Sequence, residues 1–227
     1  MLSISYGGAL PGGDLDDRFG YTSLLGFEVG HKLKNNWYAS GGAHFLYGNT
    51  LNEPVAQNIL TLQEDSNGRT IWTAIGVDGR FSEVRVFERG VAVPIRIGKS
   101  IPIFGKANPN SGFYIEGGAQ FLQHKVKIDV IAQNVPALDP EPRKGYDRLT
   151  NGFGALEGFG YRHFANNYLT NFFIGFEFSQ NFTELRRDVQ YDTGETPDGL
   201  RIDLLNSIKV GWVFPIYKKA PDKFYIF

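Results

Sequence analysis

Hydrophobic and polar side chains alternate along most of this chain, and the stretch Asn171–Ser179 shows the pattern most clearly. In a β-strand, successive side chains point to opposite faces. One face of this stretch is apolar and carries Phe172, Ile174, Phe176 and Phe178. The other face carries Glu177 among glycine, small polar residues and Phe173. A soluble sandwich would bury the apolar face, whereas a transmembrane barrel would place it in lipid and Glu177 inside.

Seven further segments repeat the alternation and predict strands. They are Leu2–Gly7, Tyr21–Leu33, Trp37–Tyr47, Val84–Ile97, Phe113–Lys125, Leu149–Arg162 and Leu204–Ile216. The facing of the segment Leu149–Arg162 is left open, because Phe153 and Phe159 share one parity with Glu157. Eight strands is an even number, and most of them exceed the ~9–11 residues that cross the hydrocarbon when tilted.

The connections between these segments alternate in length, which favours a membrane barrel over a soluble one. Long polar segments follow the first, third, fifth and seventh strands, and shorter turns follow the second, fourth and sixth. Outer-membrane barrels have this asymmetry, with long loops outside and short turns in the periplasm. We therefore predict an all-β fold: an eight-stranded antiparallel up-and-down transmembrane β-barrel with a filled polar interior and long extracellular loops. It spans residues 1–217, and residues 218–227 form a C-terminal periplasmic tail.

The polar face of the predicted strands collects charges of both signs. These residues are Glu28, His44, Arg96, Glu116, Glu177 and Lys209. An eight-stranded barrel is only wide enough for side chains to fill it. An unpaired charge inside would cost several kcal/mol. We therefore expect an interior ion-pair network and no pore, unlike the apolar ligand cavity of a lipocalin.

Composition excludes several other classes of protein. The formal net charge is −1, so there is no basic field to hold nucleic acid. The chain contains no cysteine, which rules out disulfide scaffolds, thiol redox chemistry and cysteine zinc sites. We find no apolar run of the ~18 residues that a transmembrane helix needs. An outer-membrane protein requires a secretory signal, which we do not find, so we expect the sequence to be a mature or trimmed form.

Two groups of residues could take part in catalysis or metal binding. His44 with Glu28 or Glu116, and Ser40 nearby, could form the base of a lipid hydrolase or acyltransferase, but a structural network is favoured. Asp14, Asp16 and Asp17 could bind calcium or form a catalytic carboxylate pair, but turn carboxylates that cap backbone amides are favoured. We expect no metal and no cofactor.

Several short motifs resemble a small outer-membrane barrel family of Bacteroidota. They are Pro11–Asp14, Asp17–Gly20, Phe87–Gly90, Asn108–Gly112, Phe121–Lys125 and Lys144–Gly152. The resemblance spans nearly the whole chain. It implies an accessory subunit beside a larger machine, either the barrel-assembly machinery or the type 9 secretion apparatus. The terminal Phe227 resembles the end signature of such barrels, although Lys209–Tyr217 fits that signature better.

Many of these motifs lie in predicted loops, and loops carry function more often than scaffold positions do. The residues that we expect to bind a partner are Asp14, Asp17, Arg18, Tyr146, Asp147 and Arg148. The sequence thus predicts a non-enzymatic scaffold subunit of an outer-membrane complex for protein assembly or secretion. Its partners would be other outer-membrane barrel and surface proteins, the lipid bilayer and lipopolysaccharide. The alternatives are a lipid hydrolase or acyltransferase and a free-standing adhesion or membrane-integrity barrel.

Overall fold

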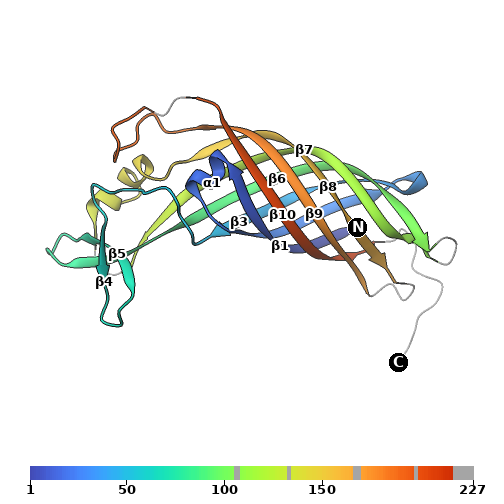
Figure 1. Cartoon of the computed structure of the whole chain (residues 1–227), viewed down its shortest axis with the longest axis horizontal. Coiled ribbons are helices and arrows are strands. Elements are labelled where there is room, and N and C mark those ends of the chain that lie inside the picture. Colours follow the sequence, from blue (N-terminus) through green and yellow to red (C-terminus); the bar gives the residue numbers. More distant parts are fainter. Residues whose placement is uncertain (105–107, 132–133, 166–169, 197–198, 217–227) are drawn as a thin grey trace.

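Eight antiparallel strands close into a barrel, which confirms the predicted fold (Figure 1). The computed structural model describes residues 1–104, 108–131, 134–165, 170–196 and 199–216. The barrel strands are β1 (Leu2–Gly13), β2 (Thr22–Lys32), β3 (Trp37–Gly48), β6 (Phe81–Phe104), β7 (Asn108–Val130), β8 (Thr150–Phe164), β9 (Asn171–Leu185) and β10 (Arg201–Phe214). The pairings β1–β10 and β3–β6 complete the cylinder.

The strand register shows how steeply the strands tilt. Starting at Trp37, the ladder passes through Lys99, Ile115, Phe159, Phe176, Ile208, Gly8 and Ser23 and returns to β3 at Tyr47. The shift from position 37 to position 47 is a shear of ten residues. Such a stagger requires strands that tilt strongly, typically by about 35–45°. Residues far apart in the sequence therefore meet at one depth.

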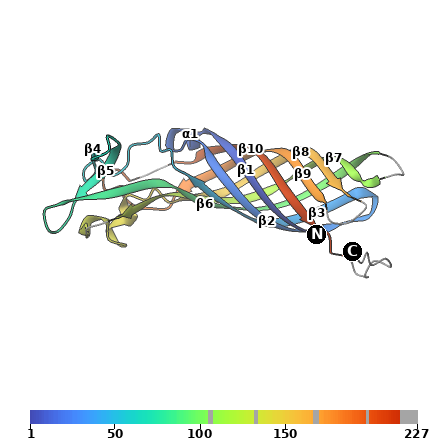
Figure 2. The ribbon, with the colours of Figure 1, turned by 90° about the horizontal axis from the view of Figure 1, so that it is seen from below.

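The two ends of the barrel differ, as the connection lengths predict. The long segments gather at one end, here called the loop end, with the helix α1 (Asp14–Arg18) and the hairpin β4 (Thr61–Glu64) and β5 (Thr70–Ile75) (Figures 1 and 2). Two 3₁₀ helices, Pro136–Leu138 and Pro142–Gly145, also lie in these segments. The short turns lie at the opposite end, the turn end, which includes the 3₁₀ turn Lys34–Asn36. β5 pairs with β6, so the hairpin extends the sheet beyond the barrel (Figure 2).

Large apolar side chains cover the outside of the barrel. Ile95 is 71% exposed and Phe153 is 70% exposed, although both lie in strands that are paired on either side. In water such a surface would be an aggregation hazard, whereas in a bilayer it is the surface that contacts hydrocarbon. The facing of β8, which the sequence left open, is now clear: Leu156 and Gly158 point inward, and Glu157 points outward with Phe159.

Side chains fill the interior of the barrel, as predicted, and they form two layers. Charged side chains occupy the layer nearer the turn end. Nearer the loop end, the inward-facing side chains include an apolar layer of Leu24, Leu46, Leu122 and Leu205, beside buried polar residues such as His124 and Asp203. Leu15 and Phe19, in and just after α1, are fully buried against this apolar layer. The loop end is therefore sealed by a small hydrophobic core.

Some predicted boundaries are wrong. Ala9–Gly13 was assigned to a loop but belongs to β1, because its backbone pairs with β10. β6 and β7 are also longer than predicted, since they continue beyond the barrel at the loop end, where β5 and β4 join the sheet. Pro94 within β6 suggests a bulge or an edge position, but the β3–β6 ladder keeps its register and lacks only the pairs at Pro94 and its neighbour. A proline has no amide hydrogen to donate there.

The predicted tail, residues 218–227, lies outside the described residues. So do residues 105–107, part of the predicted turn between β6 and β7. Among the described residues, no helix has the length and apolar character that a membrane span would require.

A charged residue introduced on the outer wall should destabilise the barrel more when it lies deeper in the membrane. Phe176 lies within the outward-facing run of β9, whereas Phe182 lies near the loop end of that strand. We expect Phe176→Arg to lower the free energy of unfolding in lipid vesicles by about 2–4 kcal/mol, and Phe182→Arg by about 0–1 kcal/mol. Urea titration of the two variants measures the difference. Equal losses would show that this face of β9 does not contact hydrocarbon.

Candidate functional site

A cluster of charged side chains fills the middle of the barrel, and Arg96 on β6 lies at its centre. Arg96 Nη1 is 2.8 Å from Glu28 Oε1 and 3.4 Å from Glu116 Oε1. Arg96 Nη2 is 2.8 Å from Glu177 Oε2. The hydroxyl of Tyr38 donates a hydrogen bond of 2.6 Å to Glu116 Oε2. One guanidinium thus contacts carboxylates from three other strands.

Lys209 on β10 and His44 on β3 complete this interior cluster. Lys209 Nζ donates to His44 Nδ1 at 3.0 Å and also to Glu177. An ammonium group can only donate, so His44 Nδ1 is an acceptor and the ring carries its proton on Nε2. His44 Nε2 donates to Glu28 Oε1 at 2.8 Å. His44 is therefore neutral here, and the cluster holds three carboxylates against two cations.

The structure brings together all six residues that the alternation assigns to the interior network. Glycines on the same face provide the room. A Cβ atom on Gly42 would lie 2.7 Å from Glu28 Cγ, and one on Gly26 would lie 2.8 Å from His44 Cδ2. Both distances are shorter than real contacts, so a side chain at either position would displace a member of the cluster.

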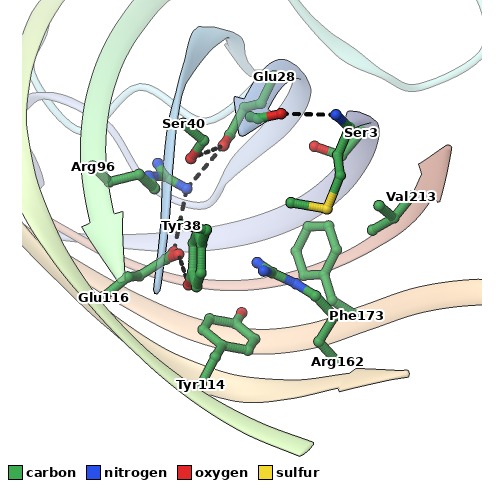
Figure 3. Close-up of a pocket in the computed structure, with 12 residues that line it drawn as sticks. Ser3, Glu28, Tyr38, Ser40, Arg96, Tyr114, Glu116, Arg162, Phe173 and Val213 are labelled. Carbon is green, nitrogen blue, oxygen red and sulfur yellow. Dashed lines mark hydrogen bonds and ion pairs between the residues drawn. The ribbon is translucent and has the colours of Figure 1, made fainter. Parts of the chain in front are cut away.

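Arg162 on β8 fills the interior on the turn-end side of this cluster. Its guanidinium lies 4.4 Å from the ring centroid of Tyr38, 4.8 Å from that of Tyr114 and 6.0 Å from that of Phe173. These are distances for cation–π attraction. Figure 3 shows the side chains around a cavity of about 30 Å³. That volume suits on the order of one water molecule, so the described residues leave no channel here.

Ser40 and His44 do not form a nucleophile and base. Ser40 Oγ donates to Glu28 Oε2 at 3.2 Å, while both ring nitrogens of His44 are occupied by Lys209 and Glu28. A serine hydrolase needs a free imidazole nitrogen that accepts the proton of its nucleophile. The geometry therefore favours a structural role for both residues, and no observation on the described residues favours the hydrolase hypothesis.

Two buried arginines join the loops over the loop end of the barrel. Arg18 and Arg148 are each 2% exposed. Arg18 Nε donates to Glu53 Oε2 at 2.7 Å, and Arg148 Nε donates to Glu53 Oε1 at 3.1 Å. Arg148 Nη2 also donates to Asp192 Oδ2 at 2.9 Å. These four side chains, here called the cap cluster, come from α1 and from the segments after β3, before β8 and after β9.

Further contacts hold the same loops. Arg187 donates two hydrogen bonds to Asp147, at 2.8 and 2.6 Å, and they raise the pKa of Arg187. The rings of Tyr146 and Tyr191 pack edge to face, with their centroids 5.6 Å apart. Burial lowers the pKa of Arg18, and the neighbouring carboxylate of the cap cluster opposes that shift. The loops therefore form one connected cap.

The cap contains most of the residues that were predicted to bind a partner. Four of them are buried: Arg18, Tyr146, Asp147 and Arg148. Asp17 is exposed. Asp14 is half-buried, and its Oδ2 accepts a hydrogen bond of 2.6 Å from the amide of Ile202. Partner binding by these loops stays a prediction. The four buried residues would hold the binding surface in shape rather than touch the partner.

The acidic stretch of the first loop forms the helix α1. Asp14, Asp16 and Asp17 all lie in its first turn, where carboxylates suit the positive end of the helix dipole. Among the described residues, no group of three or more histidine and acidic side chains is placed to hold a metal ion.

Sequence reasoning missed a second buried pair near the loop end. His124 Nε2 lies 2.8 Å from Asp203 Oδ2, which also accepts a hydrogen bond of 2.5 Å from Thr183. Phe19 packs edge-on against the His124 ring at 5.5 Å. The alternation within the predicted strand Phe113–Lys125 assigned His124 to the inner face. Asp203 lies one residue before the predicted last strand, so it was not assigned to either face. Glu53 and Asp192 were missed because no local pattern marks them.

Comparison with known proteins yields similar solved structures but no family. No family model matches the sequence, and none of the curated proteins matches it. The attachment invasion locus protein Ail of Yersinia pestis is 11% identical, with a TM-score of 0.39 and coverage of 93% of this chain and 95% of Ail. OprG of Pseudomonas aeruginosa is 10% identical, with a TM-score of 0.42 and coverage of 93% and 94%. The porin NanC is 10% identical, with a TM-score of 0.21 and coverage of 94% and 100%.

Removing the central cation of the interior cluster should be costly. Arg96→Met leaves three buried carboxylates without their shared partner, so we expect the free energy of unfolding to fall by about 3–5 kcal/mol. Lys99→Met on the same strand is the control, because Lys99 is exposed and only lies over the Trp37 ring at 5.6 Å. Its loss should stay below about 1 kcal/mol. Equal effects in vesicle-embedded protein would contradict the central role of Arg96.

Cutting the cap cluster should loosen the loops and spare the barrel. In Glu53→Gln, both arginines lose their shared carboxylate, so we expect faster amide exchange around Arg148 and Asp192. The amides of the paired barrel strands should keep their protection. Hydrogen-exchange mass spectrometry measures both regions in one sample. Glu64→Gln, on the exposed hairpin, should change neither, and an unaltered cap in Glu53→Gln would refute the linkage.

Proposed function

We propose that this chain is an integral outer-membrane protein that acts as a non-enzymatic accessory or scaffold subunit of a multiprotein complex. The observation that supports this most is the filled interior: side chains occupy the barrel from Arg162 to the apolar layer. Because the described residues leave no channel, the outer wall and the capped loop end are the surfaces left for function. Both are binding surfaces, and the cap cluster gives the loop end a defined shape.

The rim of the barrel supports contact with anionic lipid. Near the loop end, the Arg89 guanidinium lies 4.1 Å from the ring centroid of Phe87, and Lys127 Nζ lies 5.6 Å from the same ring. Lys125 is the cross-strand partner of Arg89. Cations beside an aromatic ring suit a membrane interface, where phosphate groups of lipopolysaccharide would be their partners. This supports a loop end that faces outward from the cell.

The host of the proposed subunit would be a machine for outer-membrane protein assembly or for protein secretion. Support for this choice comes from the motif resemblance, which points to accessory barrels of those machines. The physical support for this choice of host is indirect. Several loops join to form the cap, and side chains fill the interior of the described barrel. A free-standing adhesion or membrane-integrity barrel is the alternative that an experiment must separate.

Purification of the tagged chain from native membranes in mild detergent tests the proposal. We expect the full-length protein to elute with at least one other outer-membrane protein in a constant ratio, on size exclusion and by quantitative mass spectrometry. A control barrel of similar size, carrying the same tag, should not retain that protein. A clean monomer under these conditions would contradict the scaffold role and favour a free-standing barrel.

A further inference from the structure

A charged side chain lies on the apolar outer wall of the barrel, halfway along a strand. Glu157 on β8 is exposed and points outward, between Ala155 and Phe159. It is the eighth of the fifteen residues of β8, so it lies at the centre of the strand. Its cross-strand neighbours on the same face are Gly117 and Phe178.

The depth of Glu157 makes it costly in lipid. The next residue, Gly158, is the inward-facing cross-strand partner of both Glu116 and Glu177, so Glu157 lies at the level of the interior cluster. Within the described part of the chain, Glu157 makes no hydrogen bond or ion pair. Ionisable groups at this depth are rare and mark functional positions, because hydrocarbon offers them no partner.

A groove on the outer wall passes beside this carboxylate. Its volume is about 640 Å³, and it is lined mainly by Trp37, Ile97, Ile115, Glu157, Phe159 and Phe178. The floor is Gly117, where a Cβ atom would meet only the Leu156 carbonyl oxygen at an unstrained 3.7 Å. Packing within the barrel therefore does not require a glycine there. The missing side chain instead leaves space on the outside.

We infer that the wall formed by β6, β7 and β8 docks a second, different membrane-spanning protein, which presents a lysine or arginine to Glu157 within the bilayer. The inference rests on the proposed scaffold function and names its contact surface. A carboxylate at the centre of the bilayer is stabilised when a partner supplies the opposite charge and excludes lipid. The glycine-floored groove lets the partner's backbone approach closely, as small residues do in membrane interfaces.

A second copy of this chain does not supply the required charge. Two copies in the same membrane orientation that met through this wall would bring Glu157 towards Glu157. Lys99, also on the groove, lies beside Trp37 near the turn end. It is therefore at a different depth and cannot face Glu157 across a two-fold axis. Charge complementarity thus points to a different protein.

Site-specific photo-crosslinking in native membranes tests this surface. A photoreactive amino acid replaces Gly117 in the full-length chain, and a matched variant carries it at Phe27 on β2, across the barrel. We expect the Gly117 position to crosslink a second protein at a segment that contains lysine or arginine, and the Phe27 position to crosslink lipid. A crosslink to another copy of this chain, or to lipid alone, would overturn the inference.

The charge itself is tested in the same crosslinking background. Glu157→Lys should reduce the Gly117 crosslink by at least about tenfold, since like charges in a desolvated contact repel. Glu157→Gln, which is close in size, should reduce it less. Unchanged thermal unfolding of each variant shows that the barrel is intact. An unchanged yield of the Gly117 crosslink in Glu157→Lys would contradict the inference.

If the wild type keeps a co-purifying partner while Gly117 crosslinks only lipid, the docking surface is wrong and the scaffold function stands. A wild-type monomer overturns both.

Discussion

The requirement that buried charges find a partner governs the interior of this barrel, and among the described residues Glu88 meets it with a hydrogen bond from Thr22 rather than an ion pair. An eight-stranded cylinder encloses only enough space for its own side chains, so water cannot screen the charges inside it. Arg96 meets that requirement by contacting three carboxylates, and Lys209 supplies the second cation. The glycines of the inner face follow from the same constraint, because the charged side chains occupy their space.

The same principle extends to the loop end, where it gives the molecule its outer surface. Long polar loops would ordinarily be mobile, but here buried arginines bind carboxylates that come from separate loops. Beneath them, α1 and the residue that follows it press Leu15 and Phe19 onto the apolar layer of the barrel. Over the part of the chain that the structure describes, side chains fill the barrel and the loops cap one end, which leaves surfaces and no passage. Glu157 lies on the outer wall at the level of the interior cluster and makes no ion pair among the described residues, which is why it points to a neighbouring protein.

Much of the architecture could be predicted because the two-residue period is local. Alternation along each segment was enough to find eight strands, their connections and the inner face that carries Glu28 and Lys209. It failed at the strand ends, where pairing with a neighbouring strand extends β1, β6 and β7 through residues typical of loops. It also failed for the cap: Arg18 and Arg148 were predicted to be surface residues, since nothing near them in sequence indicates Glu53 or Asp192.

By itself, the sequence determined the fold class, the number of barrel strands and the side of most strands on which each charge lies. Those properties depend on neighbours one or two residues apart. Only the tertiary structure decided which charges meet, how the loops close and that Glu157 faces outward. The ladder shifts by ten residues around the barrel, so the depth of any side chain depends on all eight strands together. A contact set by that closure cannot be read from one strand.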